Sequence, residues 1–268
     1  MNKDKYIKIT KNVIMFFMYF LWQIVPILFL EVMGLDSSKF NLFQKNLYLI
    51  LSNLSYLIIV VLVYYKELKL DFKKYKKNFK EIFIKYLPVY VLGVVLMGVT
   101  NTIISGFTNM NISSNESSVR EYIKLLPIYM SFSTVIYAPI VEEITFRKII
   151  KNVVDNKYLF VIVSGVMFGM VHLNINPSIN DYLMIIPYII MGLDFAYIYS
   201  KTDTIFSTIG FHMLHNLILL IIQFIGDQLW IVNSFLRKNE KFKIKKIIAQ
   251  QRTVSEGTVM NSFCQWRH

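Results

Sequence analysis

Three short motifs place ionisable or hydrogen-bonding side chains inside apolar stretches of the sequence. They are EEITFR at residues 142–147, FGMVH at 168–172 and FHMLHN at 211–216. A charged side chain at the centre of a bilayer costs about 2.5–3.5 kcal/mol on insertion scales, so each such residue is a candidate functional residue. A carboxylate and imidazoles that converge in a desolvated site can activate a water molecule for hydrolysis.

The first motif contains two adjacent carboxylates that need not share one role. Positions i and i+4 lie on the same face of a helix, so Glu143 is predicted to pair with Arg147, which reduces the cost of burying both. Glu142 lies about 100° around the helix from Glu143 and remains available for chemistry.

The second and third motifs supply the nitrogen atoms of the predicted site. His212 and Asn216 share a helix face, whereas His215 projects elsewhere and is interpreted as a structural or supporting residue. In one mechanism Glu142 is the general base and His172 helps to hold or deprotonate the water. The His212–Asn216 edge then stabilises an oxyanion that develops on a peptide carbonyl.

A second mechanism uses the same side chains as metal ligands. Glu142, His172 and His212 offer the oxygen and nitrogen ligands of a catalytic zinc with an open position for water. Both mechanisms lead to hydrolysis of an amide, so zinc remains an open alternative and no other cofactor is predicted. The sequence contains no H-E-x-x-H motif, no phosphate-binding glycine loop and no evident Ser-His-Asp arrangement.

Each motif also has a purely structural interpretation. The charged end of EEITFR is typical of a helix cap whose arginine reaches the headgroups, and single histidines often bond to a neighbouring membrane helix. Three such motifs in one bundle favour a shared site. A transporter with a proton-relay carboxylate is a further alternative, but it predicts inverted repeats and broken glycine-rich helices, which are not evident in the sequence.

The elements that must position these residues are predicted to be membrane-spanning helices. The chain has 268 residues, of which 55% are hydrophobic and 17% are charged, and its mean hydropathy is +0.47, a composition that soluble domains rarely show. A span needs about 20 apolar residues. The candidate spans are Val13–Met33, Leu47–Tyr65, Tyr86–Ile104, Leu125–Val141 and beyond, Tyr158–Leu173, Leu183–Tyr199 and Thr204–Ile225. We therefore predict an all-α polytopic bundle of seven spans, or eight if the stretch Gln228–Leu236 returns through the membrane.

Basic residues set the predicted orientation and the division of the chain. The net charge is +12, but the lysines lie mostly between apolar stretches, so membrane topology explains them and no nucleic-acid partner is expected. The lysines before the first span and those between residues 66 and 85 predict a multi-pass protein of the cell membrane with a cytoplasmic N-terminus. We divide the chain into N-terminal helices with a basic cytoplasmic loop (1–120), a catalytic helical core (121–226) and a basic, partly disordered tail (227–268). The single cysteine, Cys264, excludes a disulfide within the chain.

In order and spacing, the three motifs resemble the E-E-x-x-x-R, F-x-x-x-H and H-x-x-x-N/B motifs of the CPBP family of CAAX proteases and bacteriocin-processing enzymes, also called the Abi family. The resemblance covers roughly Leu125–Leu220. It implies an intramembrane endopeptidase that acts on a membrane-associated peptide or protein. The alternative is a catalytically silent protein of the same fold that serves in bacteriocin self-immunity or as a membrane scaffold.

The resemblance also assigns roles to individual positions. It implies that Glu142 and His172 activate water and that His212 and Asn216 bind the oxyanion. The supporting positions are Glu143, Arg147 and Phe168. The family is called metalloprotease by habit, and the sequence decides neither the metal requirement nor the oligomeric state.

The predicted span ends raise a geometric problem. At 1.5 Å per residue from the expected cytoplasmic ends, Glu142, His212 and His172 lie about 8, 13 and 22 Å deep. One water molecule cannot contact all three at that spread. We therefore expect some spans to begin elsewhere, with Arg147 and Lys148 drawn into a polar cavity that opens to the cytoplasmic side.

Overall fold

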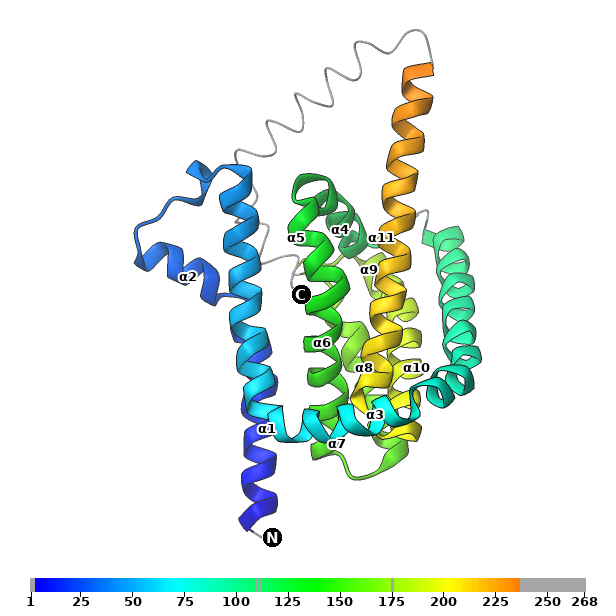
Figure 1. Cartoon of the computed structure of the whole chain (residues 1–268). Coiled ribbons are helices and arrows are strands. Elements are labelled where there is room, and N and C mark those ends of the chain that lie inside the picture. Colours follow the sequence, from blue (N-terminus) through cyan, green and yellow to red (C-terminus); the bar gives the residue numbers. More distant parts are fainter. Residues whose placement is uncertain (1–2, 109, 111, 175, 237–268) are drawn as a thin grey trace.

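The computed structural model describes residues 3–108, 110, 112–174 and 176–236, and every regular element in these ranges is a helix (Figure 1). In chain order these are α1 (Lys3–Leu21), α2 (Val25–Val32), η1 (Ser37–Lys39), α3 (Leu42–Thr108), α4 (Ser114–Leu125), α5 (Pro127–Phe132), η2 (Ser133–Tyr137), α6 (Ala138–Glu143), η3 (Ile144–Ile149), α7 (Ile150–Val153), α8 (Lys157–Met170), α9 (Ile179–Met184), α10 (Ile186–Thr202) and α11 (Ile205–Leu236). The all-α prediction is confirmed. The proposed division of the chain into three parts stays a prediction.

The elements α5 to α7 follow one another without a break and form a single helical rod (Figure 1). The rod contains two π-helical turns, η2 and η3, in which the backbone is wider than in an α-helix. Pro139 lies in the first turn of α6, directly after η2, and cannot donate a backbone hydrogen bond. Turns of this kind are common at functional sites, and Glu142 and Glu143 lie between the two.

The predicted first span, Val13–Met33, is broken. Helices α1 and α2 are bent by 60° relative to each other, and α2 projects sideways from the bundle (Figure 1). Pro26 occupies the first turn of α2 and removes a backbone donor, which ends the preceding helix. The predicted span is therefore a bent pair of helices.

Helix α3 joins two predicted spans and the basic loop between them into one helix of 67 residues. A straight helix of that length would measure about 100 Å, three times the thickness of the bilayer core. Instead α3 descends one side of the bundle, crosses it near its lower end and ascends the other side (Figure 1). We call residues 66–85 the crossing segment. Its lysine, glutamate and leucine residues are strong helix formers, so the predicted loop is helical.

The predicted number of spans, seven or eight, is not confirmed. Among the described residues three helices are long and apolar enough to cross a membrane, or four if the bent pair α1 and α2 counts as one. This count of three or four treats α3 as one helix although it has two legs, and it does not include the rod or the shorter apolar helix α8. The protein is a membrane protein by these helices, and the exact count stays a prediction.

Glycines allow α8 and α10 to pack with their backbones in close contact. A Cβ atom on Gly192 would lie 2.6 Å from the carbonyl oxygen of Gly165, and a Cβ on Gly165 would lie 2.8 Å from the backbone nitrogen of Leu193. Such small-residue contacts are a common way to pack membrane helices. They hold Phe168, which belongs to the predicted site, against the bundle centre, where it is 3% exposed.

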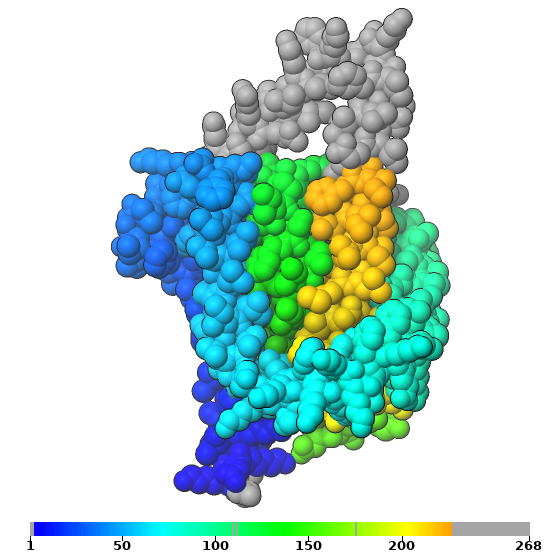
Figure 2. Space-filling view, in the orientation of Figure 1, coloured from blue at the N-terminus to red at the C-terminus, as the bar shows by residue number. Residues whose placement is uncertain are grey.

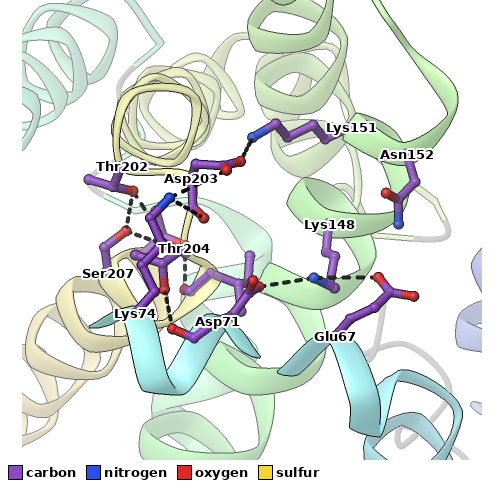
Figure 3. A network of polar contacts seen from close by, with 12 residues as sticks. Glu67, Asp71, Lys74, Lys148, Lys151, Asn152, Thr202, Asp203, Thr204 and Ser207 are labelled. Atoms are coloured by element: carbon purple, nitrogen blue, oxygen red, sulfur yellow. Dashed lines mark hydrogen bonds and ion pairs between the residues drawn. The ribbon is translucent and has the colours of Figure 1, made fainter. Parts of the chain in front are cut away.

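Polar contacts gather the segments that the sequence assigns to one membrane side. Lys148 bonds to Asp71 at 2.9 Å, and Asp203 pairs with both Lys74 and Lys151 (Figure 3). These contacts join the crossing segment, the end of the rod and the α10–α11 turn. At the opposite end of the bundle Ser114 bonds to Asp181. The grouping of these segments is confirmed, while the cytoplasmic assignment stays a prediction.

Helix α11 continues in one direction through residues 228–236 and ends at Leu236 (Figure 1). The alternative in which Gln228–Leu236 returns through the membrane as an eighth span is therefore wrong. Residues 237–268, which carry most of the predicted disordered tail and Cys264, lie outside the described residues.

Candidate active site

Glu143 lies at the centre of the candidate site and contacts two partners with different oxygens. Its Oε2 lies 3.1 Å from Nε of Arg147, and its Oε1 lies 2.9 Å from Nδ1 of His212. The side chains of Glu143 and Arg147 are both fully buried. The predicted Glu143–Arg147 pair is therefore confirmed, and the same carboxylate joins the rod to α11.

Arg147 is held mainly by charge and by aromatic rings. Its guanidinium carbon lies 4.2 Å from the ring centre of Phe168 and 5.7 Å from that of Phe195. None of its three guanidinium nitrogens makes a well-aligned hydrogen bond within the described residues. Stacking on rings and pairing with Glu143 offset part of the cost of burying this cation.

His212 lies between the two adjacent carboxylates. Because an ionised carboxylate only accepts hydrogen bonds, the contact with Glu143 places a hydrogen on Nδ1 of His212. The opposite ring nitrogen, Nε2, lies 3.9 Å from Oε2 of Glu142. That distance is too long for a direct hydrogen bond. The Glu142 side chain is 17% exposed, so it is the accessible carboxylate of the pair.

His172 lies just beyond the end of α8 and has a fixed orientation. Its Nδ1 lies 2.9 Å from the carbonyl oxygen of Phe168, so Nδ1–H donates and Nε2 keeps its lone pair. The imidazole stacks on Tyr188 with 4.2 Å between ring centres. The Phe168 ring lies 5.0 Å from the His172 ring and 5.7 Å from the His212 ring, so both imidazoles contact the same aromatic side chain.

The π-helical turns offer backbone carbonyls to side chains of other helices. Asn216 donates from Nδ2 to the carbonyl oxygen of Thr134 in η2 at 2.8 Å, and Ser164 donates to that of Phe146 in η3 at 2.6 Å. A π-turn shifts the backbone hydrogen-bond register and so leaves carbonyls within reach of other donors. Asn216 is therefore anchored to the rod through one amide hydrogen, and its second hydrogen is available to a ligand.

One part of the predicted depth mismatch, the difference between Glu142 and His172, arose mainly from the position of the rod's end. The depth of about 8 Å corresponds to an end near Arg147, whereas the helix runs to Val153, so Glu142 lies about 16 Å from its end. His172 lies about 22 Å from the start of α8 and His212 about 10 Å from the start of α11. Side-chain length closes the remaining gap between Glu142 and His212.

Two residues of this region were not predicted from the sequence. Asp194 on α10 has a buried Oδ2 with no hydrogen-bond partner in the described residues, and it lies within electrostatic range of Arg147. Asp194 stands in the apolar stretch MGLDFAY, so a search for ionisable residues within the predicted spans would have found it. Tyr188 has no such sequence signal, because its stacking on His172 depends on the fold.

The side chains do not form a ready metal site. In the described part of the chain no three His, Cys, Asp or Glu side chains are grouped closely enough to hold a metal ion. The three predicted ligands Glu142, His172 and His212 are therefore not grouped as a metal site in this arrangement, and the zinc alternative stays a prediction.

An apolar cavity of about 370 Å³ lies beside the site, between α1, η3 and α8. Its lining residues are Phe16, Phe20, Phe146, Met167, Met170, Val171, Leu173 and Asn174. Phe146 precedes Arg147 in the chain, and His172 lies between two lining residues. This cavity differs in character from the polar cavity expected from the sequence, which stays a prediction.

Comparisons with known proteins bear on the same region. Residues 124–218, which include all three motifs, match the family described as type II CAAX prenyl endopeptidase Rce1-like. The chain is 32% identical over 114 residues to YdiL of Bacillus subtilis, whose name describes it as a membrane peptidase, with 41% of this chain and 43% of that protein covered. It is 26% identical over 231 residues to the membrane-embedded CAAX protease MroQ of Staphylococcus aureus, with 78% of this chain and 87% of that protein covered.

A third relative is an uncharacterized protein of Mycoplasma capricolum, 28% identical over 204 residues, with 70% of this chain and 59% of that protein covered. The alignments thus span about half the length of YdiL and of the Mycoplasma protein. No solved structure matches the chain.

The apolar helices and the match of residues 124–218 support the class of membrane-embedded CAAX-protease-like proteins. Within that class the matches and motifs together support the CPBP family for residues 124–218.

Proposed function

We propose that this protein is a membrane-embedded endopeptidase that hydrolyses a peptide bond of a membrane-associated peptide or protein. The supporting observation is the position of His212 between a fully buried carboxylate, Glu143, and a partly exposed one, Glu142. A 3.9 Å separation between Nε2 of His212 and Oε2 of Glu142 is a distance that one water molecule can bridge. The family and the relatives named as proteases support the same reaction class.

In the proposed mechanism Glu142 accepts a proton from this water, and the oxygen attacks the scissile carbonyl carbon. The lone pair on Nε2 of His172 helps to orient the water. The developing oxyanion accepts hydrogen bonds from Nε2–H of His212 and from the second amide hydrogen of Asn216. His212 donates from both ring nitrogens only when its ring is protonated. Glu142 then returns the proton to the leaving amine.

The surroundings of the site favour an apolar, membrane-associated substrate. The cavity beside Phe146 and His172 is lined mostly by phenylalanine, methionine and aliphatic side chains. Methionine-rich surfaces adapt to apolar ligands of different shape. We further propose that the protein resides in the cell membrane with its N-terminus in the cytoplasm, since the basic segments that lie together at one end of the bundle satisfy the positive-inside rule.

The test compares cleavage of membrane-anchored peptides by purified wild-type protein and by Glu142→Ala and His172→Ala variants. We expect turnover to fall by about 10²–10⁴-fold in each variant. Glu121→Ala, which removes an exposed carboxylate of α4, is the matched control and should keep full activity. Equal turnover in all four proteins would reject the enzyme and favour the silent immunity or scaffold alternative. A parallel assay with a zinc chelator tests the metal-dependent mechanism.

A further inference from the structure

The crossing segment of α3 carries an unusual density of lysines on an exposed surface. Figure 2 shows the segment lying across the outer face of the bundle, near the end at which α1 begins. Its lysines are all exposed, and they are Lys66, Lys69, Lys73, Lys74, Lys76, Lys77, Lys80 and Lys85. The segment runs roughly perpendicular to the spans, so it lies along a membrane surface rather than through it (Figure 1).

The acidic residues near the start of the segment point toward the bundle. Glu67 pairs with Lys11 at 2.8 Å and with Lys148 at 3.5 Å. Asp71 also pairs with Lys148, at 2.9 Å (Figure 3). These two carboxylates are therefore neutralised by cations of other helices and do not neutralise the lysines of their own segment. Lys74 is the exception among the lysines, because it pairs with Asp203 at 3.4 Å.

Most of the other lysines lie on one face of the helix. With 3.6 residues per turn, six of them fall within an arc of about 100°. These six are Lys66, Lys69, Lys73, Lys76, Lys77 and Lys80, which we call the lysine face. The buried residues Leu68 and Ile82 lie on the opposite side of the helix. None of the six has an acidic partner within the described part of the chain.

Large apolar side chains border the lysine face. Leu70 is 70% exposed, and Phe72 and Phe79 are 51% and 50% exposed. By the same helical geometry Phe72 and Phe79 lie along one edge of the face and Leu70 along the other. Lysines combined with exposed aromatic and aliphatic side chains are typical of helices that lie in the headgroup region of a bilayer.

We propose that the lysine face binds the anionic headgroups of phospholipids in the surrounding leaflet. Charge complementarity supports this partner, because six cations without an acidic partner in the described residues lie on one arc and attract a surface of phosphate groups. The apolar border favours a lipid surface over a nucleic acid or a soluble acidic protein, since those partners leave Leu70, Phe72 and Phe79 in water. The inference goes beyond the proposed hydrolysis and does not depend on it.

The experiment measures lipid preference and needs no substrate. The full chain is reconstituted in phosphatidylcholine bilayers that contain trace spin-labelled phosphatidylglycerol or spin-labelled phosphatidylcholine. Electron paramagnetic resonance then gives the ratio of their association with the protein. For wild type we expect a preference for phosphatidylglycerol of about threefold or more at low salt, falling as added salt screens the charges.

Two variants that each remove four charges from the same end of the molecule make the test specific. The first replaces Lys69, Lys73, Lys76 and Lys80 of the lysine face by glutamine. The control replaces Lys3, Lys8, Lys157 and Lys201, which are also exposed, by glutamine. We expect the first variant to lose most of the preference and the control to keep it. A milder variant, Lys73→Gln with Lys76→Gln, should lose part of it and serves if the first variant does not fold.

Three outcomes would overturn the inference. Wild-type protein without a preference for phosphatidylglycerol would do so directly. An equal loss in both four-lysine variants would show an effect of net charge rather than of this face. Binding of a single-stranded oligonucleotide through the lysine face, with no lipid preference, would assign the face to nucleic acid.

Discussion

Nδ1 of His212 lies 2.9 Å from Oε1 of Glu143, and this contact fixes which ring nitrogen faces the neighbouring carboxylate. Glu143 stands on the rod and His212 on α11, so two separate helices are joined at one atom pair. Nε2 is left to point toward Glu142. The adjacent glutamates thus differ in role, because one orients the imidazole and the other is accessible.

Glu142→Gln is expected to separate chemistry from folding. Glutamine has nearly the same volume but cannot accept the proton from water, so peptide cleavage should fall by about 10²–10⁴-fold. Thermal unfolding should change little, because Oε2 of Glu142 lies 3.9 Å from Nε2 of His212, too far for a direct hydrogen bond. A large loss of stability would show that Glu142 is a structural residue. Glu142→Asp, which keeps the carboxylate but withdraws it, should retain a fraction of the activity.

Glu143→Gln is expected to destabilise the protein as well as inactivate it. The change leaves Arg147 fully buried without its anionic partner, and breaking a buried pair in this way costs about 3–5 kcal/mol. The double variant Glu143→Gln with Arg147→Met removes both charges, so it should recover much of the free energy of unfolding but none of the activity. A single variant as stable as wild type would contradict this account of the pair.

Lys148→Met tests the attachment of the crossing segment to the rod. Lys148 is 5% exposed and bonds to Asp71, and a hydrogen bond between charged groups contributes about 1.5–3 kcal/mol. We expect a loss of stability of that order, measured by denaturant unfolding in detergent. A double-mutant cycle with Asp71→Asn should give a coupling energy of similar sign and size. Lys201→Met, at an exposed site, is the control and should be neutral.

Asp203 is expected to make stability depend on pH at the α10–α11 turn. Burial alone would raise the pKa of Asp203, but the hydrogen bond from Lys151 and the charges of Lys151 and Lys74 lower it below its usual value. A lowered pKa means that the carboxylate stabilises the folded state above its unfolded pKa and loses this effect as pH falls through the folded pKa.

The matching variant is Asp203→Asn, since asparagine also tolerates the left-handed backbone found there, with φ of 51°. Near pH 7 the free energy of unfolding of the wild type should exceed that of the variant by less than about 1 kcal/mol, because the carboxylate is largely exposed and screened. The difference should shrink as the pH falls below the unfolded pKa of about 3.9, vanish below the folded pKa, and also shrink in high salt. A difference that grows toward acid pH would contradict the assignment.

Gly192→Ala is expected to disrupt the contact between α8 and α10. The added Cβ would lie 2.6 Å from the backbone oxygen of Gly165, so the helices must move apart. Overpacking of this kind costs about 1–3 kcal/mol and should lower the unfolding temperature. Gly98→Ala is the control, because no heavy atom lies within 4 Å of its added Cβ. Equal effects of the two changes would show that the close approach is not required.

Local spacing predicted the parts of the site that lie on one helix. The Glu143–Arg147 pair follows from the i, i+4 rule and is present although it crosses from α6 into a π-turn. For His212 the sequence predicted only that the three motifs converge, and it did not predict that the ring lies between the two glutamates. The anchoring of Asn216 by Thr134 could not be predicted, because the π register of η2 makes Pro139, which has no N–H, the residue opposite the Thr134 carbonyl and so leaves that carbonyl open.

The span boundaries were wrong for a physical reason that hydropathy cannot detect. Lys148 reads as the charged end of a span, yet it is neutralised by Asp71, a residue far away in the sequence. The helix therefore continues to Val153. Helix α3 gives the opposite error, since its many charges suggest a loop but their side chains are compatible with a continuous helix.

The unbroken course of α3 has a consequence for the exchange of its amide hydrogens with solvent. A loop between two spans leaves backbone amides open to water, where they exchange rapidly and where proteases cleave. In the crossing segment these amides are bonded along the helix, and contacts of Asp71 and Lys74 with other elements hold the helix in place. The most hydrophilic stretch between the two legs of α3 is thus protected from deuterium and protease to an extent that its lysine content alone would not suggest.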